Sequence, residues 1–283
     1  MRYERALSRV DLDSLDSKVF ARSLLSMGQT MSTANVIMQL ANPAVGYAVA
    51  RSTVDSGRLD RHPVKRARTT ASYLAVAVFG TATDRRRYRQ AVNRQHVQVR
   101  STLDSPVSYD AMSVRLQLWV AACLYVGWED IYQRVHGPLC GEYREEFYRQ
   151  GMVLGTTLQM PAELWPTDRD AFEVYWQQQV AMIDISDEVR DFLLGIAHFD
   201  YAPRLIKKRY GPLKYRRTIG YLPQPFREAL GVIWTAEDQD WFDGYVRRLI
   251  ARERRKPLWL SQLGFRLLLL DTRVRHKLGR PLV

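Results

Sequence analysis

The feature that most constrains the fold is the recurrence of apolar residues every three or four positions. It is clearest in the stretch around Leu118, where the residues with this spacing are Ala111, Val114, Leu118, Ala121, Ala122 and Tyr125. Further apolar residues fill the other sides of the same stretch, as expected of a helix that is buried all round. Alternating strand-like patterns bounded by turn residues are nearly absent. The sequence therefore predicts an all-α fold with this helix at its centre.

Two further patterns predict helix starts, and a third predicts a C-terminal helix. Thr167 with Asp170, and Thr235 with Asp238, have the spacing of a capping box. Leucines recur through the basic tail at Leu258, Leu260, Leu263, Leu267 and Leu270. The chain shows neither a repeat of fixed period nor a low-complexity linker. We expect a flexible N-terminus over residues 1–15 and a single helical domain over residues 16–283, with basic helices at its C-terminal end.

The charge of the chain is unevenly distributed. The net charge is +12, and residues 247–283 hold eleven Lys and Arg against only Glu253 and Asp271. Such a segment attracts anionic lipid or nucleic acid, although a solvated basic helix is the plainer interpretation. The most apolar run, Leu116 to Val126, is too short to span a bilayer, and acidic residues interrupt the first 16 positions where a signal peptide would be apolar. We expect a soluble cytoplasmic protein, and peripheral contact with an anionic membrane through the basic C-terminus stays open.

Common catalytic motifs are missing from the sequence. It has no glycine-rich phosphate loop, no GxSxG elbow and no HExxH helix, which weighs against nucleotide-binding proteins and hydrolases. No two of the five histidines have the spacing that places a metal pair on one helix turn, and Cys123 and Cys140 form no CxxC pair. A zinc or di-metal site made by protein ligands alone is therefore not expected.

Two local patterns suggest chemistry without defining it. His96 follows Tyr88 and Val92 at helical spacing and precedes Val99, so its imidazole is expected on an apolar helical face. A hydrogen-bonded core histidine is the more common meaning of that pattern. Arg66 and Thr70 lie four residues apart and can share one face of a helix start. From spacing alone, an ordinary basic first turn capped by Thr69 or Thr70 is the preferred interpretation.

Taken in order, several stretches resemble the family of latex clearing protein, a rubber oxygenase, and the MpaB oxygenases. Four carry the resemblance, and they are VIMQLANPAVGYAVARS from Val36, RARTTASYLAVAVFGT from Arg66, HVQVR from His96 and YDAMSVRLQLWVAACL from Tyr109. Weaker matches continue through YREEFYRQGMVLG and LPQPFREALGVIW. The resemblance covers about residues 36 to 235.

The resemblance implies a helical fold around haem b, with His96 of the HxxVR-like motif as the ligand of the iron. It places the paired arginine and threonine of the family's RxxxT motif on Arg66 and Thr70, near the haem and its oxygen-binding side. Arg66 would pair with a haem propionate or stabilise negative charge on iron-bound oxygen, and the Thr70 hydroxyl would donate a hydrogen bond to that oxygen. The implied protein is an oxidoreductase that uses dioxygen on an apolar, isoprenoid or lipid-like small molecule.

Three positions depart from the family pattern. Histidine is frequent in the family where this chain has Asn42, and again at Ala121. A lysine that can cap the distal iron position in latex clearing protein falls on Thr69. The first two changes affect packing or hydrogen bonds near the haem, and the third implies a distal side open to water or oxygen.

Two other functions stay open at this stage. A haem-free helical protein that binds lipid or a membrane surface is favoured by Trp259, which lies close to the basic run Arg252 to Lys256. Nucleic-acid binding has the charge but lacks a recognisable recognition module, and it is the least favoured.

Overall fold

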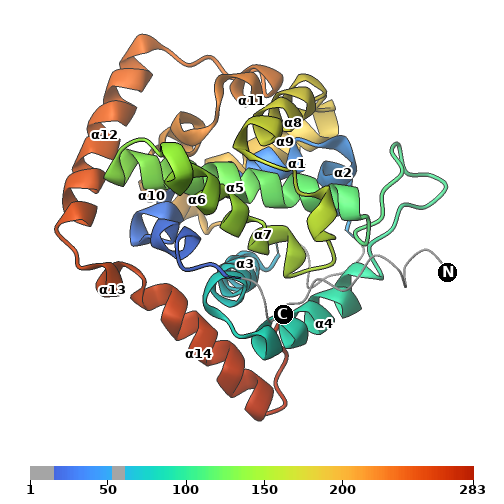
Figure 1. Cartoon of the computed structure of the whole chain (residues 1–283). Coiled ribbons are helices and arrows are strands. Elements are labelled where there is room, and N and C mark those ends of the chain that lie inside the picture. Colours follow the sequence, from blue (N-terminus) through green and yellow to red (C-terminus); the bar gives the residue numbers. More distant parts are fainter. Residues whose placement is uncertain (1–15, 53–60) are drawn as a thin grey trace.

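The protein is described by a computed structural model that covers residues 16–52 and 61–283. Across these residues the regular structure is helical, with one isolated β-bridge between Arg100 and Asp110 (Figure 1). The predicted all-α fold is confirmed, whereas the predicted flexible residues 1–15 lie outside the described part. Short 3-10 helices are η1 (Phe20–Ser23), η2 (Ser26–Met31) and η4 (Ala162–Leu164). The α-helices are α1 (Ser32–Leu40), α2 (Pro43–Ala50), α3 (Pro63–Phe79), α4 (Ala82–His96), α5 (Val114–His136), α6 (Gly141–Gly151), α7 (Val153–Thr156), α8 (Arg169–Ala181), α9 (Asp187–His198), α10 (Arg204–Tyr221), α11 (Gln224–Ala229), α12 (Ala236–Arg254), α13 (Leu258–Ser261) and α14 (Leu263–Lys277).

Helix α5 is the central helix, as its continuous apolar pattern predicts. It crosses the middle of the molecule and packs against α1, α7, α12 and the two N-terminal 3-10 helices (Figure 1). Trp119, Ala122, Cys123 and Tyr125 are all fully buried. The helix begins at Val114, so Ala111 lies in the turn before it.

One of the two predicted helix starts is confirmed, and the other is displaced by a residue. Thr235 and Asp238 form a capping box at the start of α12. At the start of α8 the cap is Asp168, whose carboxylate accepts a hydrogen bond from the Ala171 N–H at 2.8 Å. The Thr167 hydroxyl instead donates to the Asp168 side chain at 3.2 Å. Asp168 rather than Thr167 caps the helix because a carboxylate is the stronger acceptor for the free N–H groups of the first turn.

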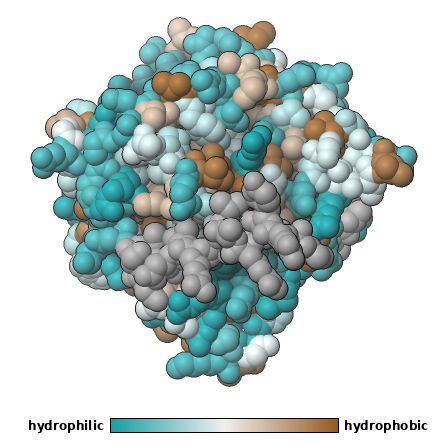
Figure 2. Space-filling view, turned by 45° about the vertical axis from the view of Figure 1, so that its right-hand side comes forward, coloured by the Kyte–Doolittle hydropathy of each residue, from teal (hydrophilic) through white to brown (hydrophobic). Residues whose placement is uncertain are grey.

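The C-terminal helices form one edge of the molecule. Helix α12 leads through α13 into α14 (Figure 1), and α14 packs against α3. The leucine pattern therefore predicts the tail helix correctly. On the face drawn in Figure 2, apolar side chains stand in small groups among polar ones. Among the described residues, we find no helix that is long and apolar enough to cross a membrane.

Candidate functional site

The site begins with the N-terminal turns of α3. Pro63 opens this helix, where its missing N–H costs nothing, and the Arg66 N–H donates to the His62 carbonyl at 2.9 Å. Thr69 and Thr70 consequently lie inside the helix, and the alternative in which one of them caps it is wrong. The Thr69 hydroxyl donates back to the Arg66 carbonyl at 3.0 Å. Arg66 and Thr70 are therefore one helical turn apart on α3, as their spacing predicts.

Helix α4 is held against this turn by Tyr88. Its ring is fully buried, and its hydroxyl donates to the Thr69 carbonyl at 2.6 Å. The helix itself starts from a capping box formed by Thr81 and Asp84. The single hydrogen bond from Tyr88 fixes the separation of α3 and α4 beside Arg66.

His96 is the last residue of α4. Val99 lies beyond the helix end, so the expectation that it extends the same helical face is wrong. The Nδ1 atom of His96 is buried and has no hydrogen-bond partner. Burial, together with the positive charge of Arg66, lowers the pKa of His96 to about 4. The imidazole is therefore neutral at pH 7 and retains a lone pair for a ligand.

Arg66 is the charged residue whose field acts on His96. Its Nε is buried without a hydrogen-bond partner, and burial lowers the pKa of its guanidinium. Within residues 16–52 and 61–283, no carboxylate forms an ion pair with Arg66. Arg66 as a whole is half-buried, and a cation with a buried, unpaired nitrogen is stabilised by an anion that reaches it. Arg66, near the N-terminal end of α3, and His96, at the C-terminal end of α4, thus each have one buried nitrogen without a hydrogen-bond partner.

The third predicted residue, Thr70, is half-buried one turn beyond Arg66. The structure thus brings Arg66 and His96 within electrostatic reach of each other and places Thr70 on the same helix as Arg66. Their chemical roles remain predictions.

Two other histidines have aromatic partners. The ring of His136 lies 4.6 Å from that of Tyr132, and the ring of His198 stacks on Tyr215 at 4.2 Å with an interplanar angle of 8°. These contacts give both imidazoles a packing role, and neither ring nitrogen is buried without a partner as in His96. They are suitable controls for His96.

The two other departures from the family pattern have clear local consequences. Asn42 is the N-cap of α2, and its side-chain oxygen accepts from the Ala44 N–H at 3.1 Å. Ala121 is buried in α5 beside Gly155. Asn42 is therefore used as a cap, and Ala121 permits close packing of α5 and α7.

Sequence reasoning missed the residues that position α4. Arg89 donates to the Thr157 carbonyl at 3.1 Å and also to the Thr156 carbonyl, both at the C-terminal end of α7. Asn93, one turn before the end of α4, accepts from the Gln159 side chain. Arg89 and Asn93 follow Arg85 at helical spacing, but nothing in the sequence identifies the carbonyls and amide that they meet.

A cavity of about 310 Å³ lies elsewhere, between α1, the second half of α5, and the helices α10, α11 and α12. Its walls combine Met31, Met38 and Phe242 with Arg134 and Arg227. Sequence reasoning missed it because its lining comes from helices far apart in the chain. Within the described part of the chain, no group of three or more His, Cys, Asp or Glu is arranged to hold a metal ion.

Comparisons with known proteins identify the family of the chain. The chain is 43% identical over 253 residues to two uncharacterized proteins, one from Mycobacterium bovis and one from Mycobacterium tuberculosis. Each alignment covers 89% of this chain and 99% of the relative. No solved structure matches the chain. Residues 19–251 match the family described as ER-bound oxygenase mpaB/B′ and rubber oxygenase, catalytic domain. The chain belongs to this family of oxygenase catalytic domains.

Proposed function

We propose that this protein is a haem b-dependent oxygenase that acts with dioxygen on an apolar, isoprenoid or lipid-like substrate. The observation that carries the proposal is the pair of buried nitrogen atoms without partners, Nδ1 of His96 and Nε of Arg66, on adjacent helices. Membership of an oxygenase family supports the class of reaction.

The residues present fit a haem. His96 is neutral at physiological pH because burial and Arg66 lower its pKa to about 4, and a neutral imidazole is the usual haem ligand. Arg66 has a charge to neutralise, and a haem propionate supplies a carboxylate for it. When bound, the haem would supply the activation of dioxygen, which no side chain provides.

The chain's own residues would then hold and orient the cofactor. His96 would bind the iron through one imidazole nitrogen, and the low pKa keeps protons from competing for it above about pH 4. Arg66 would fix the cofactor's orientation through an ion pair at its anionic edge. Thr70, one turn along α3, would present its hydroxyl as a hydrogen-bond donor, while Tyr88 holds α3 and α4 at a fixed separation.

Thr69 stands where the family resemblance places a lysine that can cap the iron. Its hydroxyl is turned back to the Arg66 carbonyl, and threonine lacks the reach and basicity of a lysine. Thr69 would therefore not bind the iron and would leave the haem accessible to dioxygen.

The first experiment tests haem binding. Protein produced with ample haem supply should show a Soret band, and its reduced form should bind carbon monoxide readily. His96→Ala should lose the band and keep its helical circular dichroism. His136→Ala and His198→Ala are matched controls, and both should retain the band. A haem-supplied protein without Soret absorbance would overturn the proposal.

The second experiment tests the reaction. The haem-loaded protein is incubated with polyisoprene or squalene under ¹⁸O₂, and products are analysed by mass spectrometry. Oxidative cleavage of a carbon–carbon double bond predicts carbonyl products that contain ¹⁸O. Products that lack ¹⁸O would contradict an oxygenase that uses dioxygen in this way.

A further inference from the structure

The outer face of α14 carries a continuous apolar stripe. The inner face packs on α3 through Phe265, Leu269 and Thr272, which are buried. The stripe on the opposite face comprises Leu263, Leu267, Leu270 and Val274, whose exposed fractions lie between 39% and 55%. Their spacing of four, three and four residues puts all four on one line along the helix.

Helix α13, directly before α14, adds further exposed apolar residues, which we count with the stripe. They are Leu258, Trp259 and Leu260, and Trp259 is 63% exposed. Seven large exposed apolar side chains thus belong to two consecutive helices. A patch of this kind on a protein surface marks a site of contact with another apolar surface.

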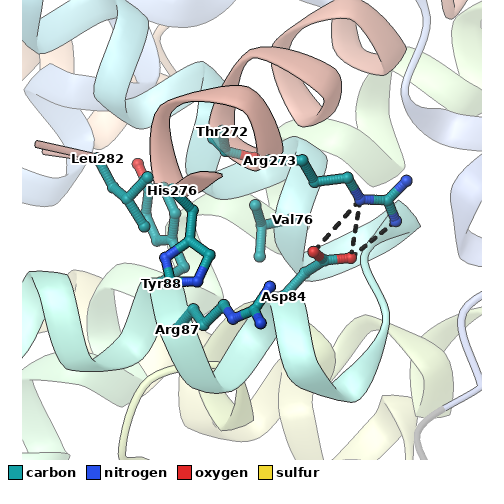
Figure 3. A pocket seen from close by; sticks show the side chains of 8 residues that line it. All are labelled: Val76, Asp84, Arg87, Tyr88, Thr272, Arg273, His276 and Leu282. Carbon is teal, nitrogen blue, oxygen red and sulfur yellow. Dashed lines mark hydrogen bonds and ion pairs between the residues drawn. The ribbon is translucent and has the colours of Figure 1, made fainter. Parts of the chain in front are cut away.

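The stripe is presented on a helix that is firmly attached to the rest of the protein. Arg273 forms an ion pair with Asp84 of α4 at 2.7 Å, and Asp271 lies 3.5 Å from Arg68 of α3. Figure 3 shows the Arg273–Asp84 pair and the last turn of α14 lying over α4, with Leu282 turned back toward Tyr88. Helix α14 is therefore an ordered part of the fold that leaves its leucines outside.

The positive charge of the C-terminal segment indicates which kind of surface the stripe binds. From residue 252 to the C-terminus the chain has nine Lys and Arg, and its two acidic residues are already paired, Glu253 with Lys256 at 3.0 Å and Asp271 with Arg275 at 2.7 Å. A second copy of the same face would bring like charges together. An anionic lipid surface offers both an apolar layer for the stripe and negative headgroups for the basic side chains.

We infer that α13 and α14 form a docking surface for an anionic bilayer, with Leu263, Leu267, Leu270, Val274 and Trp259 entering the boundary between headgroups and acyl chains. The surface begins beyond residue 251, where the family match ends. Since α14 packs directly on α3, docking would bring the bilayer to the helix that carries Arg66. The inference does not depend on haem binding, so either can fail alone.

The test uses the full-length protein and unilamellar vesicles of phosphatidylcholine with about one-third phosphatidylserine. The variant Leu267→Ser/Leu270→Ser/Val274→Ser removes the centre of the stripe. The matched control is Val174→Ser/Ile233→Ser, two apolar residues that are 59% and 87% exposed away from α14. We expect the stripe variant to bind these vesicles at least about tenfold more weakly, because several apolar side chains no longer enter the bilayer. The control should bind like the parent, and all three proteins should have the same circular dichroism.

A second measurement locates the contact. Vesicles with brominated acyl chains should quench the tryptophan emission of the parent, and Trp259→Phe should remove most of that quenching, because Trp259 is the most exposed part of the stripe. Equal vesicle binding by the parent and the stripe variant would overturn the inference. So would a parent that does not bind the anionic vesicles. A dimeric parent that becomes monomeric in the stripe variant, with vesicle binding unchanged, would assign the stripe to a second copy.

Discussion

Replacement of Arg169 by methionine should destabilise the protein strongly, because it isolates a buried carboxylate. Arg169, at the start of α8, donates to both oxygens of Glu129 in α5 at 2.8 and 2.9 Å. The two side chains are only 13% and 7% exposed. Tyr125 also donates to Glu129, at 2.7 Å. After Arg169→Met, this single hydrogen bond would be the remaining protein partner for the Glu129 charge within the described residues.

The expected loss in the free energy of unfolding is about 3–5 kcal/mol, the usual cost of removing one partner of a buried ion pair. An unfolding entropy of about 2.1 cal/mol/K for each of 283 residues gives about 0.6 kcal/mol per kelvin. A loss of 4 kcal/mol therefore lowers the melting temperature by about 7 °C.

Urea unfolding followed by circular dichroism measures this loss. Arg144→Met is a matched control, because Arg144 pairs with Asp170 at 2.7 Å but the two side chains are 32% and 83% exposed. That variant should lose less than about 1 kcal/mol. A similar small loss for Arg169→Met would refute the reasoning. The double variant Arg169→Met/Glu129→Gln should recover part of the stability, because it removes the isolated charge.

Three other predictions concern Arg66, Lys214 and Gly28. Arg66→Met should stabilise the haem-free protein by about 1 kcal/mol, since it removes a half-buried cation that has no ion-pair partner among the described residues, and it should lower haem occupancy. A marked loss of stability in urea would contradict this. Burial lowers the pKa of Lys214 from 10.5 to about 8. Between these two pH values the unfolded chain binds more protons than the folded protein, so the free energy of unfolding should rise from pH 8 to 10.5. Lys214→Met should flatten that rise in the urea midpoint, and an unchanged slope would count against it. Gly28→Ala should destabilise the protein by about 1–3 kcal/mol, because the added Cβ would overlap the buried ring of Trp128. An unchanged melting temperature would contradict this.

Local patterns in the sequence predict the helices well, because helix formation depends on near neighbours. The apolar period identifies α5, and the capping box at Thr235 gives the start of α12. The same period predicts α14 but leaves its orientation open, since Leu263, Leu267 and Leu270 face solvent where a core is the usual expectation. Which side of a helix is buried depends on the shape and charge of its neighbours, and these come from distant segments.

The candidate site is less predictable. Spacing places Arg66 and Thr70 on one turn of α3, and the family resemblance selects His96. Tyr88 positions α4 by donating a hydrogen bond to the backbone carbonyl of Thr69 in α3. A backbone carbonyl belongs to every residue, so the sequence does not indicate which one a tyrosine will meet. The early end of α4 at His96 was likewise not expected, because Val99 continues the apolar spacing past the end of the helix.

The central claim is that His96 binds the haem iron, and the most direct measurement is the Soret absorbance of His96→Gly with and without added imidazole. Removal of the side chain leaves space for a free imidazole in place of the ring whose Nδ1 is buried. If His96 is the ligand, the variant should lose the Soret band of the haem-supplied parent and regain it when imidazole is added. A variant that keeps the parent's spectrum without imidazole would contradict the claim.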